Sequence, residues 1–276
     1  MHVWDATTGQ VSRTFPEITG AVFSVAFSPD GRRLAAAGVQ AGGPIAQVAK
    51  VWDADTGRNT FTIPETRGIF ALEFSPDRRW LALGMSDGTV NLWDAVTGQE
   101  IGLVGKHAHE VRGVAFRSDG RRLASGSNDR TIKVWDVTWA METHSPQPIL
   151  TLRGSDAGFW GVAFSHDGQR LAAVSGDGQL TLWDAETGQR IHSVSGQFSG
   201  QGSSVAFSPD GRWLASAAEG CTVKLWDAAT VEWKHTFRGH TMPVRRLAFS
   251  RDGRRLVSGG QDRTVKVWDL SRLRRE

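Results

Sequence analysis

The sequence contains few of the features on which several protein classes depend. Cys221 is its only cysteine, so the chain cannot form an internal disulfide, and its cysteine usage does not indicate an oxidising compartment. No apolar run approaches the roughly 20 residues that a membrane-spanning helix needs, and no basic segment followed by an apolar one stands after Met1. These absences predict a cytoplasmic protein with no membrane partner.

A large excess of charge and motifs linked to helices are also missing. The chain has 32 basic and 29 acidic residues, and its formal net charge of +3 permits a nucleic-acid partner without requiring one. No glycine-rich phosphate loop precedes a helix, and the patterns predict no helix at all. The only close histidine pair, His107 and His109, has no cysteine or carboxylate cluster at ligand spacing. We therefore expect no metal site, no cofactor and no small-molecule substrate.

A repeat of about 42 residues fills the chain instead. Trp-Asp closes an apolar run seven times, with the tryptophan at positions 4, 52, 93, 135, 183, 226 and 268. A second motif recurs with the same period, ahead of six of these Trp-Asp pairs. Examples are VAFSPDGRRLAA from Val25 and LAFSRDGRRLVS from Leu247. Self-similarity at a period of this size is typical of stacked or radially repeated architectures.

Each repeat has the pattern of four short strands. VAFS is a short apolar strand, and the Pro-Asp-Gly after it predicts a turn, because proline presets φ, aspartate caps its own backbone and glycine accepts a positive φ. RRLAS and the alternating IKVWD or VKVWD are the second and third strands. A Thr-Gly turn then leads into a fourth, outer strand. One such sheet cannot bury both faces alone, but it can when it is stacked radially against its neighbours.

Taken together, these motifs resemble the WD-repeat β-propeller family over essentially the whole chain, and their dense style resembles bacterial WD repeats. The resemblance implies an all-β fold, a single-domain β-propeller of four-stranded antiparallel blades. It also implies six near-complete blades and a partial N-terminal repeat. The expected limits are 1–15 for the partial repeat, about 20–63, 67–104, 107–152, 155–194, 198–237 and 240–269 for the blades, and 270–276 for a basic tail.

The first fifteen residues have the pattern of the end of a repeat without its beginning. In this family the ring closes when the outer strand of the last blade comes from the other end of the chain, so residues 10–15 could complete the sixth blade. That arrangement leaves the strand that holds Trp4 without a place. The alternative is an incomplete seven-blade ring in which one blade keeps only its two outer strands. We expect the chain to be the C-terminal part of a longer WD-repeat protein, against the alternative of a true six-blade protein with a dispensable N-terminal strand.

The resemblance further implies a hydrogen-bonded tetrad of histidine, serine or threonine, aspartate and tryptophan in a complete unit. Two units contain all four members, namely His107, Ser125, Asp129 and Trp135, and His240, Ser258, Asp262 and Trp268. Serine, histidine and aspartate also form catalytic triads, but a nucleophile needs exposure and a neighbouring oxyanion site. We expect the tetrads to be satisfied buried polar groups, each hydrogen bond contributing about 1 kcal/mol, and we assign no catalytic residue.

The residues that would face a partner differ between units. Aligned on the shared phenylalanine of the first strand, one position near the top face of the propeller holds Phe23, Phe70, Arg112, Trp160, Ser203 and Arg245. Aromatic and arginine side chains are the usual hot spots of interfaces, so these six are candidate partner-binding residues at the mouth of the channel. The alternative is that the aromatic members pack between blades.

The opposite face would collect the arginines of the Asp-Gly-Arg-Arg turns. They are Arg32, Arg33, Arg78, Arg79, Arg121, Arg122, Arg170, Arg212, Arg254 and Arg255, and six turn aspartates partly offset them. This mildly basic ring could hold a nucleic acid or an acidic partner, although an arginine beside an aspartate in a repeated turn is usually a solvated local pair. An insertion at 137–150 enlarges one turn on that face, and its apolar, proline-containing loop is a candidate contact or linker.

The sequence therefore predicts a non-enzymatic interaction scaffold that binds a protein or peptide through the top face and the channel mouth. Two alternatives stay open: binding of a nucleic acid or an acidic partner through the arginine-rich face, and a sensory or substrate-docking module of a larger bacterial signalling protein. An enzyme with a site in the channel ranks last, because the sequence lacks the metal, paired-carboxylate or histidine clusters that such sites use.

Overall fold

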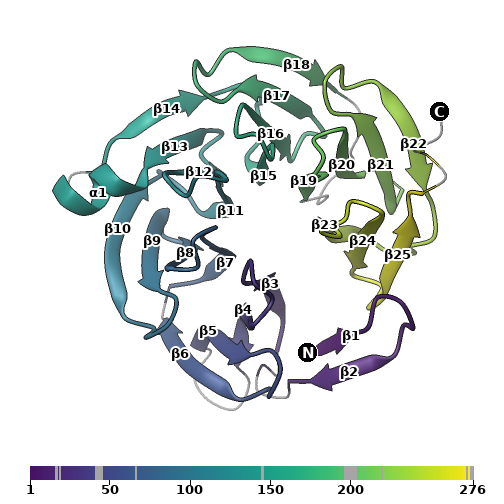
Figure 1. Ribbon diagram of the computed structural model, residues 1–276. Helices are drawn as coiled ribbons and strands as arrows, with labels where there is room; N and C mark the ends of the chain where they lie inside the picture. Colours follow the sequence, from purple (N-terminus) through teal and green to yellow (C-terminus); the bar gives the residue numbers. More distant parts are fainter. Residues whose placement is uncertain are drawn as a thin grey trace.

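The protein is a ring of small antiparallel sheets around a central channel (Figure 1). The computed structural model describes residues 1–15, 18, 20–40, 46–65, 67–143, 146–195, 204–218, 220–271 and 273. Six blades follow one another in sequence order, and a two-stranded sheet at the N-terminus lies between the last blade and the first. The predicted all-β propeller, with six blades and a partial N-terminal repeat, is confirmed.

Within each blade the strands run from the channel outward in chain order. Blade 1 comprises β3 (Val22–Phe27), β4 (Arg33–Gln40), β5 (Ala46–Asp53) and β6 (Asn59–Glu65). Blade 2 comprises β7 (Ile69–Phe74), β8 (Trp80–Met85), β9 (Thr89–Asp94) and β10 (Glu100–Lys106). Blade 3 comprises β11 (Val111–Phe116), β12 (Arg122–Ser127), β13 (Ile132–Asp136) and β14 (Pro148–Leu152).

The second half of the ring repeats this order. Blade 4 comprises β15 (Phe159–Phe164), β16 (Arg170–Ser175), β17 (Leu180–Asp184) and β18 (Arg190–Val194). Blade 5 comprises β19 (Val205–Phe207), β20 (Trp213–Ala218), β21 (Thr222–Asp227) and β22 (Trp233–Phe237). Blade 6 comprises β23 (Val244–Phe249), β24 (Arg255–Gly260) and β25 (Val265–Asp269).

The turn between the first and second strands is built from the Ser-Pro-Asp-Gly pattern. In blade 1 the Ser28 hydroxyl donates to Asp30 Oδ1 at 2.6 Å, and the same oxygen accepts from the backbone N–H of Arg32 at 3.1 Å. These two hydrogen bonds lower the pKa of Asp30 to about 2. Gly31 follows with φ 74°, a left-handed conformation that glycine adopts at little cost. In blade 2 the corresponding residue is Arg78, which adopts the same conformation with φ 67°.

The hydrophobic core lies between neighbouring blades. Side chains alternate along a strand, so Ile132 and Val134 of β13 pack in one cluster with Phe159 and Val162 of β15 in the next blade. Ala124 of β12 belongs to the same cluster, and its small side chain leaves room for the larger groups of blade 4. Each buried aliphatic or aromatic side chain contributes about 1.5–3 kcal/mol. Each complete blade therefore packs against a neighbour on both of its faces, and these apolar interfaces between blades stabilise the ring.

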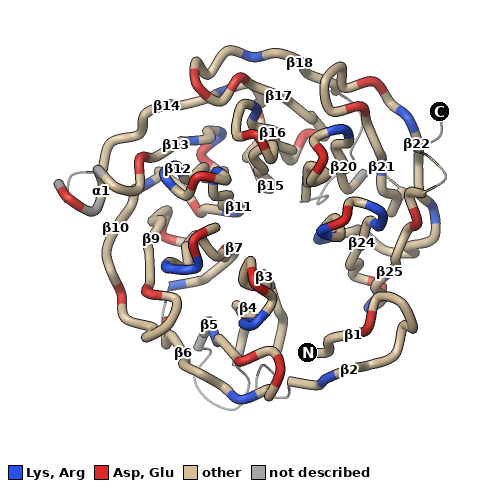
Figure 2. Tube along the Cα trace, viewed as in Figure 1, with Lys and Arg blue, Asp and Glu red and all other residues tan. Residues whose placement is uncertain are grey.

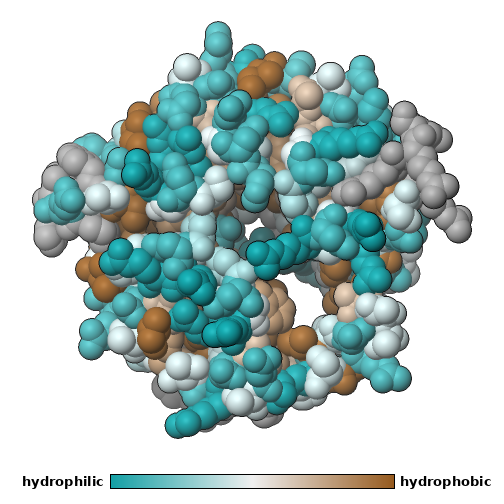
Figure 3. Space-filling model, viewed as in Figure 1, coloured by the Kyte–Doolittle hydropathy of each residue, from teal (hydrophilic) through white to brown (hydrophobic). Residues whose placement is uncertain are grey.

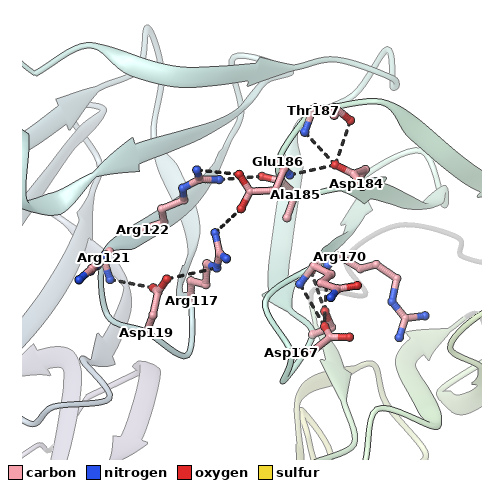
Figure 4. Close-up of polar contacts among 12 residues, drawn as sticks. Arg117, Asp119, Arg121, Arg122, Asp167, Arg170, Asp184, Ala185, Glu186 and Thr187 are labelled. Carbon is pink, nitrogen blue, oxygen red and sulfur yellow. Dashed lines mark hydrogen bonds and ion pairs between the residues drawn. The ribbon is translucent and has the colours of Figure 1, made fainter.

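Arginines of the turns also join neighbouring blades (Figure 4). Arg122 of β12 donates from Nη1 to the carbonyl oxygen of Ala185 at 3.1 Å and from Nη2 to Glu186 Oε2 at 2.8 Å. Ala185 directly follows the Trp-Asp of blade 4. The same contact links blades 1 and 2, from Arg33 to Ala95, and blades 4 and 5, from Arg170 to Ala228. The repeated turn thus holds adjacent blades together.

The N-terminal strands β1 (His2–Trp4) and β2 (Val11–Thr14) form the partial blade, which occupies a seventh position in the ring (Figure 1). Trp4 of β1 pairs with Val11 of β2, seven positions later. In blade 4, Trp183 of the third strand pairs with Arg190 of the fourth strand, also seven positions later. The pair therefore has the register of third and fourth strands. Of the two arrangements that the sequence left open, the structure has the incomplete seven-blade ring.

Blade 6 has three strands in the described part of the chain, and β2 pairs with β1 and not with β25. The alternative in which residues 10–15 complete blade 6 is therefore wrong. Pairing with the nearby β1 closes a short loop and costs less chain entropy than pairing with β25 at the far end. Phe15, next to β2, packs against Trp52 of blade 1 with ring centroids 5.5 Å apart. The expectation of a longer parent protein concerns sequence outside this chain and stays a prediction.

The prediction that the chain contains no helix is also wrong. Val137–Thr143 form a short helix, α1, in the insertion before β14. Val137 and Ala140 lie about one helical turn apart and are buried in a cluster with Trp135 and Phe116 of blade 3. A helix this short gains its stability from such packing and not from local propensity. Nowhere in the described part of the chain is a helix long and apolar enough to cross a membrane.

Candidate functional site

A cavity of about 650 Å³ opens at the mouth of the central channel. Five of the six residues that the repeat alignment selects line it together: Phe23, Phe70, Arg112, Trp160 and Arg245. Ser203, the sixth, lies outside the described residues. The residues that we predicted to bind a partner thus converge on one hollow, which is within the usual size range of ligand pockets.

A β-bulge places each of these five side chains. The pairing of β3 with β4 shifts register between Val22 and Ser24, so Phe23 is the extra residue of a bulge. The same shift occurs in blades 2, 3, 4 and 6, at Phe70, Arg112, Trp160 and Arg245. A bulge bends its strand and re-aims the side chain that it carries. Five blades therefore turn their variable residue toward the same opening, which the alignment alone does not reveal.

The aromatic rings contact each other or a neighbouring blade while remaining half-exposed. Phe23 and Phe70 meet edge to face with centroids 5.6 Å apart, and the Arg112 guanidinium lies 4.0 Å from the centroid of the Phe70 ring. Trp160 donates from Nε1 to Asn128 Oδ1 of blade 3 at 3.2 Å. The sequence offered packing between blades and lining of the channel mouth as alternatives, and these side chains do both.

Three arginines give the cavity an excess of positive charge, since Arg112, Arg245 and Arg246 all line it. Burial and the charge of Arg112 lower the pKa of Arg245, and burial and the charge of Arg245 lower the pKa of Arg246. The Glu110 carboxylate lies 3.7 Å from Arg112 and offsets part of this charge. An arginine stays protonated even when its pKa is lowered, so the cavity favours an anionic group beside aromatic surface.

Arg246 also lines this cavity, and the repeat alignment did not select it. Its Nη2 donates to the carbonyl oxygens of Phe23 at 3.2 Å and Phe70 at 3.4 Å, so a side chain of blade 6 reaches across to blades 1 and 2. The corresponding positions of the other blades hold small residues, namely Ser24, Ala71, Gly113, Gly161 and Ser204. One large charged residue among five small ones was the signal that could have revealed it.

Glu73 lies deeper in the channel, in a second hollow of about 200 Å³ that Arg246 also lines. Its Oε2 accepts from the backbone N–H of Phe116 at 2.8 Å and so joins β7 to β11. Glu73 is partly buried, and desolvation of its carboxyl group raises its pKa to about 8, although the hydrogen bond from Phe116 opposes the shift. The carboxyl group is therefore largely neutral at pH 7.

Both complete tetrads form a continuous hydrogen-bonded chain. In blade 3, Trp135 Nε1 lies 2.8 Å from Ser125 Oγ, which lies 2.7 Å from His107 Nε2, and His107 Nδ1 lies 2.9 Å from Asp129 Oδ2. Blade 6 has the same chain, through Trp268, Ser258, His240 and Asp262, at 2.9, 2.7 and 2.8 Å. Burial raises the pKa of Asp129, but hydrogen bonds from His107 and Thr131 outweigh it and hold that pKa well below its usual range. The aspartate accepts a hydrogen bond from the histidine Nδ1–H. The histidine Nε2 in turn accepts from the serine hydroxyl, and the serine oxygen accepts from the tryptophan N–H.

The tetrad serines are not placed as nucleophiles. Ser125 and Ser258 are fully buried, and each hydroxyl already contacts an indole and an imidazole. The tetrads instead tie the second and third strands of a blade to the segment before its first strand. Leu83 replaces the serine in blade 2, and there the indole nitrogen of Trp93 is buried without a hydrogen-bond partner in the described part of the chain. Within the described ranges, no group of three or more His, Cys, Asp or Glu side chains could hold a metal ion.

Many arginines of the opposite face are engaged by the fold itself. Arg33, Arg122 and Arg170 donate to carbonyl oxygens of the next blade. The guanidinium groups of Arg79 and Arg212 each lie 4.7 Å from the ring of the tryptophan that follows them. Basic and acidic residues are interleaved around the ring and do not form one block (Figure 2). This surface offers little support for the nucleic-acid alternative, which needs a continuous basic footprint.

Comparison with known proteins agrees with the repeat pattern. A family model described as "WD domain, G-beta repeat" matches residues 9–53, 57–94, 98–136, 146–184, 188–227 and 232–269. Small ribosomal subunit protein RACK1 of Caenorhabditis elegans is 32% identical over 101 residues, which cover 37% of this chain and 29% of the relative. The LST8 homolog of Drosophila melanogaster is 36% identical over 95 residues, which cover 34% of this chain and 30% of the relative. Each alignment thus spans less than a third of the relative's length.

Similarity in three dimensions extends over nearly the whole chain. A chain in a crystal structure of the mitotic checkpoint complex superposes with a TM-score of 0.80 at 27% identity, covering 98% of this chain and 84% of that chain. The two curated relatives named above are eukaryotic, so the resemblance to bacterial repeats stays a prediction. Six matched repeats and a matching propeller show that the chain belongs to the WD-repeat family.

Proposed function

We propose that the protein is a non-enzymatic interaction scaffold that binds a protein or peptide through the channel mouth on the top face of the propeller. The convergence of five bulged side chains, contributed by five blades, on one cavity carries this proposal. A repeat fold makes a specific surface by varying one exposed position on a rigid frame. A crystal structure of the mitotic checkpoint complex contains a chain of similar fold, and a partly similar protein is named as a target of rapamycin complex subunit, wat1 of Schizosaccharomyces pombe.

The lining of the cavity indicates the chemistry of the partner segment. Arg112, Arg245 and Arg246 supply positive charge, while Phe23 and Trp160 supply aromatic surface. Guanidinium groups recognise carboxylates through charge-assisted hydrogen bonds, and aromatic rings stack on apolar side chains. A peptide with an acidic residue beside an apolar one fits this lining. The cavity has room for a few side chains and not for a folded domain.

The test selects peptides that bind the intact chain from a displayed random library and then measures the affinity of the best binders for single variants. We expect Trp160→Ala and Arg245→Ala to weaken binding at least tenfold, as hot-spot residues do. Arg121→Ala, an exposed arginine on the opposite face, is the matched control and should leave the affinity unchanged. Thermal melting of each variant verifies that the ring is intact.

Selected peptides that bind every variant equally well would place the partner surface elsewhere and contradict the proposal. The nucleic-acid alternative has its own readout. Retention on heparin at low salt, with a steep loss as salt rises, would support that alternative, whereas we expect no retention. The alternative of a sensory or docking module within a larger bacterial signalling protein stays a prediction.

A further inference from the structure

The three arginines that line the channel-mouth cavity differ in how far the fold itself satisfies them. The channel passes through the ring and is open at its centre in the space-filling view (Figure 3). At its mouth, the guanidinium of Arg246 donates to two backbone carbonyl oxygens. With its amide oxygen turned toward Arg245, Gln261 accepts from Nε of that residue at 3.1 Å. The guanidinium groups of Arg245 and Arg246 are therefore both held by groups of the chain.

Arg112 is in a different position. In the described part of the chain its guanidinium donates no hydrogen bond, and its Nε is buried without a partner. A buried donor that lacks an acceptor costs free energy. The Arg112 side chain is 35% exposed, so its guanidinium can still meet a ligand. Among the three arginines of the cavity, Arg112 is the one that the fold leaves ready to donate to a bound acceptor.

Glu110 is the internal group that could satisfy Arg112 but does not. Its Oε1 lies 3.7 Å from Arg112 Nη2, which is too far for a hydrogen bond. The two residues belong to the same blade, two positions apart in the chain. A carboxylate this close could form charge-assisted hydrogen bonds to the guanidinium after a small change in its side-chain torsions. Glu110 is therefore a competitor, within the chain, for any anion that Arg112 would bind.

Asn128 holds this competitor in place. Its Nδ2 donates to the other carboxylate oxygen, Glu110 Oε2, at 2.5 Å, and its backbone N–H donates to the Glu110 carbonyl oxygen at 3.0 Å. The side-chain oxygen of Asn128 accepts from Trp160 Nε1 at 3.2 Å. One amide group thus fixes the carboxylate beside Arg112 and, at the same time, the indole that blade 4 contributes to the cavity.

Blade 6 has a different arrangement at the same positions. Gln261 takes the place of Asn128 there, directly before the tetrad aspartate, and its side chain binds Arg245. The position of Glu110 holds no acid in the other five blades, where the residues are Ala21, Gly68, Gly158, Gln201 and Pro243. Blade 3 therefore differs from blade 6 in two linked ways: it adds an acid beside the arginine, and its corner amide holds that acid instead of the arginine.

We propose that Arg112 binds the carboxylate of the partner segment, and that Asn128 is a positioning residue that keeps Arg112 available by holding Glu110 away from it. This assignment rests on the proposed function of the channel mouth and names the residue that recognises the acidic group. The guanidinium lies 4.0 Å from the centroid of the Phe70 ring, so it is stacked beside aromatic surface. An incoming carboxylate makes the hydrogen bonds that Glu110 does not make, and a neutral amide of the same shape gains less.

The test uses the full 276-residue chain and two defined probes, the tripeptides N-acetyl-Phe-Asp-Leu-amide and N-acetyl-Phe-Asn-Leu-amide. The two probes differ only in the charged or neutral end of the central side chain. Isothermal titration calorimetry at pH 7 measures both dissociation constants. We expect the Asp probe to bind at least about fivefold more tightly, because hydrogen bonds to a charged group are the stronger ones. Arg112→Gln should abolish this preference.

A double-mutant cycle tests the hold of Asn128 on Glu110. Asn128→Ala frees the Glu110 carboxylate to pair with Arg112, so it should weaken binding of the Asp probe about tenfold. Glu110→Gln should strengthen that binding, and Asn128→Ala in the Glu110→Gln background should cost about twofold or less. This rescue separates positioning from a structural role, because the contact with Trp160 is lost equally in both backgrounds.

Two further measurements complete the design. Glu232→Gln is the matched control for Glu110→Gln: it removes a negative charge whose side chain is 66% exposed and which does not line the cavity, so the affinity for the Asp probe should stay unchanged. A crystal structure of the Asn128→Ala variant needs no probe. It should show the Glu110 carboxylate within hydrogen-bond distance of Arg112.

Several results would overturn the inference. Equal affinities of the two probes or the absence of saturable binding would do so, as would a cost of Asn128→Ala that Glu110→Gln leaves unchanged. Glu110 that stays out of hydrogen-bond distance in the variant crystal structure would do the same. If library peptides still bind through Trp160 and Arg245 in any of these cases, the proposed function stands and only the role of Arg112 and Asn128 falls. If no library peptide depends on the cavity, the proposed function falls as well.

Discussion

Arg255 of blade 6 donates from Nη1 to the carbonyl oxygen of Ala6 at 3.0 Å, so the last blade of the chain holds its first turn. The contact repeats the one from Arg122 to Ala185 between complete blades, at 3.1 Å. Ala6 follows Trp4-Asp5 just as Ala185 follows a Trp-Asp pair. The acceptor of this inter-blade hydrogen bond lies in the turn after the Trp-Asp pair and not in the inner strands. The partial blade, which has this turn, can therefore make the same contact as a complete blade.

Arg255→Ala should loosen the partial blade without unfolding the ring. The variant loses a hydrogen bond worth about 1 kcal/mol, and the segment that it releases forms a sheet of only two strands in the described part of the chain. We expect faster hydrogen exchange in β1 and β2 and a small change in melting temperature. Arg122→Ala, which removes the equivalent contact between two complete blades, should instead lower the global stability. Unchanged exchange in β1 and β2 of the Arg255 variant would contradict the role assigned to Arg255.

Ser125→Ala should destabilise the protein by about 1–3 kcal/mol, because it leaves the Trp135 N–H and the His107 imidazole buried without their partner. Urea unfolding measures this as a lower midpoint at an unchanged slope. Ser193→Ala is the control, since Ser193 lies exposed on the outer strand β18 and its hydroxyl shares one hydrogen bond, of 3.1 Å, with Thr181, so we expect a smaller loss of stability. Equal midpoints for the two variants would show that the tetrad does not stabilise its blade.

Arg78→Gly should stabilise the protein by about 1 kcal/mol, because Arg78 occupies a turn position with φ 67°, where a side chain with Cβ is strained. The substitution also removes an ion pair of 3.3 Å with Asp30, but this surface pair contributes little. Arg78→Ala removes the same ion pair and keeps the strain, so it is the matched control. The prediction fails if glycine and alanine variants melt at the same temperature.

Because of Glu73, the free energy of unfolding should decrease as the pH rises above the ordinary pKa of a glutamate. Its pKa is about 8 in the folded chain and about 4.5 in the unfolded one. Between these values only the folded state holds the proton, so the free energy of unfolding decreases with pH, by up to about 1.4 kcal/mol per unit, and levels off above pH 8. Glu73→Gln keeps an acceptor for the Phe116 N–H but cannot ionise, so its stability should lack this slope. Parallel pH profiles for both chains would exclude the effect.

Local chemistry made much of the fold and part of the site predictable. The Ser-Pro-Asp-Gly turn was predictable because its hydrogen bonds are local, as between the Ser28 hydroxyl and the Asp30 carboxylate two positions later. The tetrads were foreseen because the resemblance to the WD-repeat family implies them, and two units of this sequence contain all four members. Alignment also located Phe23 and Trp160, since any position that varies on a repeated frame stands out. It could not foresee the bulges, because a bulge is a property of pairing between two strands.

The sequence by itself determined the repeating blade: its strands, its turns and the variable position at the channel mouth all depend on neighbours within one unit. Only the tertiary structure decided how the ring closes and what crosses it. The pairing of β2 with β1, the reach of Arg246 to Phe23 and Phe70, and the helix α1 against Trp135 all depend on which surfaces remain uncovered once the blades are packed. Those surfaces come from residues far apart in the chain, so no local pattern records them.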